Sequence, residues 1–198
     1  MKLYEMTMGE DDGVYAMSLV QTPATEEEFL ALADENKEEV KFSAVSEDKQ
    51  LLIGAALVPE KPIYRAGKEN EEGYYIYFSK ETVAKAARDF VQKGMQSNFT
   101  LEHGKKVDGV SVIESWIVED ENNDKSRSYG LNVPEGTWML MSKVDDINLW
   151  KDYVKANKVF GYSLEGKFGS EVKRELSDDK LDTIVLKITE AVKNYINQ

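Results

Sequence analysis

Apolar residues in this chain gather in short runs separated by polar segments, and most of the runs have the length of a strand. Residues 51–58 are an apolar run followed by Pro59 and Pro62, which predicts a buried strand. Residues 74–78, Tyr-Tyr-Ile-Tyr-Phe, are strongly β-forming. We expect strands at 13–20, 51–58, 63–65, 74–78, 99–103, 110–118, 137–141 and 159–168.

Helical periodicity is confined to three places. Ser79 is expected to cap a helix that Gly94 ends, and Asp145 or Asp146 to cap a short helix carrying Trp150. Apolar residues also recur at helical spacing across 181–196. Because strands follow one another without regular βαβ alternation, we expect an α+β fold: a mainly antiparallel small β-barrel or sheet flanked by helices, with a C-terminal helix.

The length of 198 residues suggests one domain with extra terminal segments. We divide the chain into an N-terminal strand and acidic segment at 1–50, a core at 51–168, and a charged connector with the C-terminal helix at 169–198. The 119–128 segment is polar and is expected to be a mobile loop.

Composition removes several classes of function. The formal net charge of −12 and the lack of a basic run argue against direct nucleic-acid binding. No apolar stretch is long enough for a membrane span, and the first residues lack a signal-peptide pattern, so a cytosolic protein is expected. With no cysteine and no glycine-rich phosphate loop after a strand, we expect no cofactor and no metal.

His103 is the one histidine, and Ser163 lies in the predicted strand at 159–168, between Gly161 and Gly166. A serine hydroxyl needs a base to become a nucleophile, and imidazole is the usual base near neutral pH. Strand alternation puts Ser163 on the same face as Gly161 and Glu165, and the glycines allow close approach of another backbone or a substrate. Any Ser/His chemistry in this chain therefore has a single base, His103.

A third group is needed to orient the imidazole. Glu114 is our leading candidate, because a carboxylate within an apolar strand is costly unless it is paired. Asp120, in the loop that follows, is the substitute. A solvent-facing Glu114 with no such role is an equally simple interpretation.

Several blocks of sequence resemble the XkdF-like serine proteases of tailed phages. The blocks are Ala55-Ala56-Leu57-Val58-Pro59-Glu60-Lys61-Pro62-Ile63-Tyr64-Arg65, Leu101-Glu102-His103, Val112-Ile113-Glu114-Ser115-Trp116-Ile117-Val118, Gly136-Thr137-Trp138-Met139, Lys143-Val144-Asp145-Asp146 and Gly161-Tyr162-Ser163-Leu164-Glu165-Gly166. The resemblance covers roughly residues 50–168, which makes 51–168 the protease core.

This resemblance implies a prohead maturation endopeptidase, similar in fold to herpesvirus assemblin. Ser163 would be the nucleophile and His103 the general base. The enzyme would be made in the host cytoplasm, packaged inside the phage prohead, and would cut the phage scaffold protein, the major capsid protein and itself. A homodimer would be one way to restrict that activity to the capsid interior. Assemblin-type enzymes carry an arginine after the serine, and Arg174 is the candidate for it.

Two other classes stay open. The chain could be a non-catalytic capsid-assembly protein that keeps the protease fold and binds scaffold. A Ser/His esterase is less favoured, because Ser163 is not in a Gly-x-Ser-x-Gly elbow between a strand and a helix.

Overall fold

The computed structural model describes residues 2–23, 30–32, 49–66 and 72–175. The strands are β1 (Lys2–Thr7), β2 (Gly13–Val20), β3 (Leu30–Leu32), β4 (Leu51–Leu57), β5 (Ile63–Arg65), β6 (Tyr74–Phe78), β7 (Phe99–Leu101), β8 (Lys105–Val107), β9 (Val110–Ile117), β10 (Trp138–Val144), β11 (Gly161–Lys167) and β12 (Gly169–Glu175). The helices are α1 (Lys80–Gln92), α2 (Ile147–Leu149), the 3-10 turns η1 (Met95–Ser97) and η2 (Lys125–Tyr129), and the π-helical turn η3 (Trp150–Val154).

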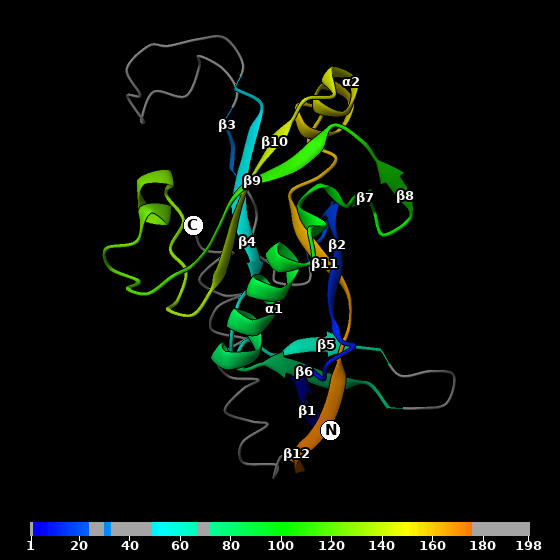
Figure 1. Cartoon of the computed structure of the whole chain (residues 1–198), viewed down its shortest axis with the longest axis vertical. Helices are drawn as coiled ribbons and strands as arrows, with labels where there is room; N and C mark the ends of the chain where they lie inside the picture. Colours follow the sequence, from blue (N-terminus) through cyan, green and yellow to red (C-terminus); the bar gives the residue numbers. More distant parts are fainter. Residues whose placement is uncertain (1, 24–29, 33–48, 67–71, 176–198) are drawn as a thin grey trace, which may run out of the picture.

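Within these residues the strands form three four-stranded sheets, with orders β12-β1-β6-β5, β3-β4-β10-β9 and β11-β2-β7-β8. We call them the terminal sheet, the central sheet and the serine sheet. Every pairing is antiparallel except β1 with β6 and β2 with β7. In Figure 1 the terminal sheet lies across one end of the molecule, while β4 and β2 run along its length on either side of α1.

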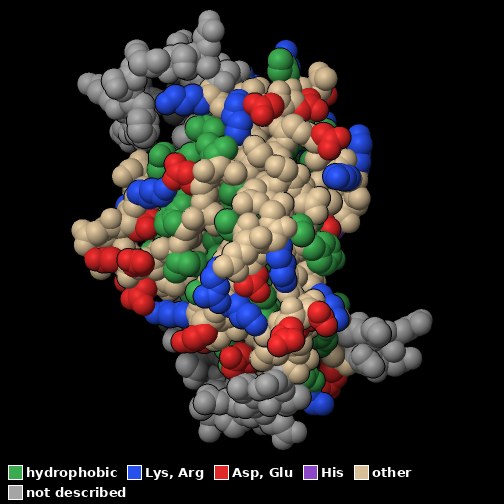
Figure 2. Space-filling model, viewed as in Figure 1, with side chains coloured by type: hydrophobic (Ala, Val, Ile, Leu, Met, Phe, Trp, Pro, Cys, Tyr) green, Lys and Arg blue, Asp and Glu red, His purple; other side chains and the backbone are tan. Residues whose placement is uncertain are grey.

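The helix α1 forms where its periodicity predicts it. The Ser79 side chain accepts a hydrogen bond from the amide of Thr82, which caps the first turn, and Gly94 follows with a positive φ of 71°. The apolar face of α1 packs in the core, where the rings of Phe90 and Trp138 contact edge to face with their centroids 5.4 Å apart. The other face is solvated, and Figure 2 shows lysine and arginine side chains gathered over the middle of this side of the molecule.

The fold is therefore a mixed α+β fold dominated by sheets, as predicted. The finer expectation, an assemblin-like barrel, is not confirmed, because the three sheets of the described residues do not join into a closed barrel. The predicted helix at 181–196 lies outside the described residues. None of the helices that the structure describes combines the length and apolar character that crossing a bilayer would require.

The proposed division of the chain into three segments stays a prediction. It must accommodate two facts of the topology: β2, from the 1–50 segment, lies between β11 and β7 in the serine sheet, and β12, from the 169–198 segment, pairs with β1. Both terminal segments thus contribute strands to sheets that the core alone would leave incomplete.

Candidate active site

His103 lies in a tight turn directly after β7. Glu102 and His103 both have positive φ, 50° and 55°, a conformation uncommon outside glycine. The turn is held by hydrogen bonds from the Gly104 amide to the Leu101 carbonyl (3.0 Å) and from the His103 amide to Ser18 Oγ (2.9 Å). These contacts fix the histidine backbone against β2, the strand that also pairs with the serine strand.

The imidazole of His103 meets a carboxylate of β11. His103 Nδ1 lies 3.4 Å from Glu165 Oε1, and the same carboxylate oxygen accepts a hydrogen bond from Thr100 Oγ1. The His103 side chain is 46% exposed and that of Glu165 only 18%. A carboxylate at Nδ1 favours the tautomer whose Nε2 is free to accept a proton. The pair therefore has the geometry of an imidazole oriented by a carboxylate.

Ser163 lies two residues before Glu165 on β11, so strand alternation puts both side chains on one face of the serine sheet. It is paired with Ser18 of β2, and Ser18 with Thr100 of β7, so three hydroxyl residues form a row across the sheet. The Ser163 residue is 8% exposed and lines a cavity of about 630 Å³. No hydrogen bond joins Ser163 to His103 among the described residues. The histidine therefore lies on the sheet face that holds Ser163 without being hydrogen-bonded to its hydroxyl.

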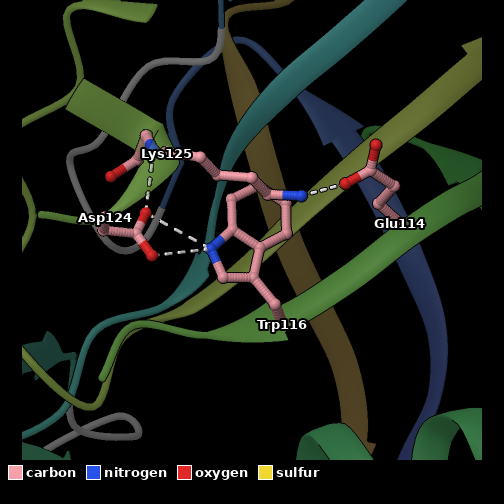
Figure 3. Close-up of polar contacts among 5 residues, drawn as sticks. Glu114, Trp116, Asp124 and Lys125 are labelled. Atoms are coloured by element: carbon pink, nitrogen blue, oxygen red, sulfur yellow. Dashed lines mark hydrogen bonds and ion pairs between the residues drawn. The ribbon is translucent and has the colours of Figure 1, made fainter. Parts of the chain in front are cut away.

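Glu114, the predicted third member, lies elsewhere. It is on β9 in the central sheet, with its side chain 43% exposed and ion-paired with Lys125. Figure 3 shows Lys125 extending across Trp116, its ammonium 3.8 Å from the ring centroid, while the indole N–H of Trp116 donates to the carboxylate of Asp124. The cost of a carboxylate in this apolar strand is avoided because Glu114 faces solvent and a lysine. The structure does not bring Glu114 to His103.

Asp120 is also distant from the histidine turn. Its carboxylate accepts hydrogen bonds from the Asn122 amide (2.8 Å) and the Asn123 side-chain amide (2.7 Å), and these bonds, the Asn123 one first, lower the pKa of Asp120. The 119–128 segment, expected to be mobile, includes the start of η2, which Asp124 caps through the Ser126 amide. Nothing among the described residues groups three His, Asp or Glu side chains as metal ligands.

The residues that sequence reasoning missed are Glu165 as the partner of His103 and Ser18 as the support of its turn. Glu165 had a usable signal, because alternation from Ser163 places it on the same face. Ser18 had none, since its contact depends on the parallel pairing of β2 with β7. Arg174 lies in β12 opposite Leu3, in the terminal sheet.

The predicted role of the glycines beside Ser163 can be examined at Gly166. A Cβ added there would lie 2.7 Å from the carbonyl oxygen of Gly13, so the backbones of β11 and β2 approach more closely than a side chain would allow. The close approach expected from the sequence is thus made by another backbone.

A scan against models of protein families finds no match for this chain, and searches of curated proteins and of solved structures find no similar protein.

Proposed function

We propose that this chain is a serine endopeptidase of the XkdF-like prohead protease type, with Ser163 as nucleophile and His103 as general base. The observation that carries the proposal is the contact between His103 Nδ1 and the Glu165 carboxylate, on the sheet face that also holds Ser163. Glu165, rather than Glu114 or Asp120, takes the role of the orienting carboxylate.

In this mechanism Ser163 Oγ attacks the carbonyl carbon of a peptide bond while His103 Nε2 takes the hydroxyl proton. The C–N bond then breaks as the same proton passes to the leaving amine. Water next attacks the acyl-enzyme with His103 again as base, which releases the acid and restores Ser163. The step requires the imidazole to turn toward Ser163 when substrate binds, and its 46% exposure leaves room for that rotation.

The substrates we propose are the phage scaffold protein, the major capsid protein and the chain itself, cut inside the prohead after synthesis in the host cytoplasm. Association into a homodimer belongs to the same proposal. It predicts that activity falls on dilution below the dimer dissociation constant.

One observation favours the second candidate, a non-catalytic assembly protein. The hydrogen bond from Ser163 to His103 that would make the serine a nucleophile is not formed in this structure. Binding of scaffold without cleavage would then be the function, and His103 and Glu165 would serve to hold the turn after β7.

The test is co-expression with the phage's own scaffold and capsid proteins, followed by mass spectrometry of the fragments. We expect new termini with wild type, none with Ser163→Ala, and wild-type fragments with the exposed control Ser128→Ala. Glu165→Gln should lower kcat/KM by roughly tenfold or more and displace its pH profile, while Glu114→Gln should not. Fragments that persist in Ser163→Ala, or proheads that assemble with no fragments in any sample, would refute the peptidase and support the assembly protein.

A further inference from the structure

The cavity beside Ser163 has apolar walls supplied by all three sheets. Ala56 and Leu57 come from β4, Ile63 from β5, Phe78 from β6, and Leu164 from β11. Its volume of about 630 Å³ is several times the ~150 Å³ of an engineered cavity that holds benzene. The space is therefore large enough for a bulky apolar side chain together with part of the main chain that carries it.

Two cationic residues, Arg65 and Lys167, also line this cavity, and none of its described lining residues is an Asp or Glu. Within the part of the chain that the structure describes, Arg65 donates to the carbonyl of its neighbour Tyr64 (3.1 Å), and Lys167 Nζ lies 4.0 Å from an oxygen of Asp12. Both residues are exposed. The chain has a net charge of −12, yet the charged side chains among the described lining residues are both cationic, and such a pair can attract a carboxylate.

The cavity runs beside the open edge of β11. In β2, the Met17 amide donates to the carbonyl of Asn98, the residue before β7, and the Leu19 carbonyl accepts from the amide of Glu102, the residue after β7. The peptide groups of Ser18, which lies between Met17 and Leu19, therefore face β11. Ser163 is paired with Ser18, and the peptide groups of Tyr162 and Leu164 on either side of it therefore point away from β2. Both residues line the cavity, and β11 is the end strand of its sheet in the described residues. An extended peptide can approach this edge with Ser163 within its reach.

We propose that this cavity is the specificity pocket for an extended peptide that carries a large apolar side chain with an acidic residue close to it in sequence. The apolar side chain enters between β4, β6 and β11, and Arg65 and Lys167 hold the carboxylate. The proposal rests on the proposed function, because Ser163 supplies the reaction for which this pocket selects the segment.

The experiment measures binding and cleavage of one peptide series separately. Fluorescently labelled hexapeptides carry leucine with glutamate, leucine with glutamine, or alanine with glutamate at the same positions. Dissociation constants come from anisotropy with the full-length Ser163→Ala chain, and kcat/KM from the wild type. Arg65→Gln/Lys167→Gln tests the cationic pair, and Lys151→Gln, an exposed lysine on η3, is the matched control.

We expect the leucine–glutamate peptide to bind about tenfold or more tightly than the alanine–glutamate peptide, because a larger apolar surface is buried. It should bind several-fold more tightly than the leucine–glutamine peptide, and added salt or the double variant should remove that second preference while Lys151→Gln keeps it. Equal binding of the three peptides, or a glutamate preference that survives in the double variant, would overturn the pocket proposal.

The two proposals can fail separately. If wild type cuts scaffold but shows neither preference, the pocket proposal is wrong and the peptidase stands. If the Ser163→Ala chain binds with both preferences while wild type cuts none of the peptides and no phage protein, the pocket is supported as a binding site and the peptidase is refuted.

Discussion

The most direct test of how the serine strand is held concerns Tyr162, the residue before Ser163. Its side chain is fully buried, and its hydroxyl lies 2.6 Å from Ser142 Oγ and donates to the Leu52 carbonyl at 3.1 Å. These bonds join β11 of the serine sheet to β10 and β4 of the central sheet. Tyr162→Phe removes the hydroxyl that makes both bonds.

The expected loss follows from the number of bonds. A buried intramolecular hydrogen bond contributes about 0.5–1.5 kcal/mol net, so we expect Tyr162→Phe to lower the free energy of unfolding by about 2 kcal/mol. For a chain of this length that corresponds to a fall in Tm of roughly 4–8 °C. Ser142→Ala should cost less, because the Leu52 bond remains, and the two changes should be non-additive.

The assay is urea unfolding followed by tryptophan fluorescence, with Tyr15→Phe as control because Tyr15 is 52% exposed. Burial raises the pKa of Tyr162 well above its ordinary value of 10.0. The Tyr162 hydroxyl therefore ionises at a lower pH in the unfolded chain than in the folded chain. The stability advantage of wild type over Tyr162→Phe should shrink as pH rises above 10. A Tyr162→Phe chain within about 0.5 kcal/mol of wild type at neutral pH would refute the reasoning.

Two further changes test the pH response of the chain and its packing. Burial first, and then nearby carboxylates, raise the pKa of Glu60, so its ionisation favours the unfolded chain. Thermal melts should therefore show Glu60→Gln to be more stable than wild type at pH 7, with no such difference below about pH 4. An equal difference in Tm at both pH values would contradict this. Gly166→Ala should lower stability by roughly 1–3 kcal/mol, because the new Cβ would meet the Gly13 carbonyl at 2.7 Å. Gly104→Ala, whose Cβ would have no heavy atom nearer than 3.8 Å, is the control, and equal melting of the two variants would disprove the clash.

Local patterns predicted the elements well where one segment carries the whole signal. The strand at 13–20 matches β2, the helix between Ser79 and Gly94 matches α1, and Asp146 caps α2 as one of the two candidates. The strand β1 was missed because Lys2–Thr7 mixes charged and apolar residues and depends on partners, β6 and β12, far along the chain. Which strands share a sheet was equally inaccessible, since pairing is decided by contacts that no local window contains.

The candidate site divides in the same way. Alternation along β11 predicts that Ser163 and Glu165 share a face, and the structure has them so. The choice of Glu114 followed from its nearness to His103 in sequence and from the apolar residues around it. That choice could not foresee that β9 joins the central sheet, where Glu114 finds Lys125 in place of the histidine.

The antiparallel pairing of β2 with β11 and of β1 with β12 sets the order in which a newly translated chain can assemble. Residues 2–20 are synthesised before residues 161–175, their antiparallel partners, which are made only after everything between them. Until then, among the described strands, β2 can pair with the three residues of β7 alone, and β1 with β6 alone. Pairings of such long sequence separation form slowly, because the entropy cost of closing a large loop is incurred before any stabilising contact forms. Ser163 lies in β11, the last strand of its sheet to be made, so the sheet face that the proposed peptidase would use is complete only after β11 has been synthesised.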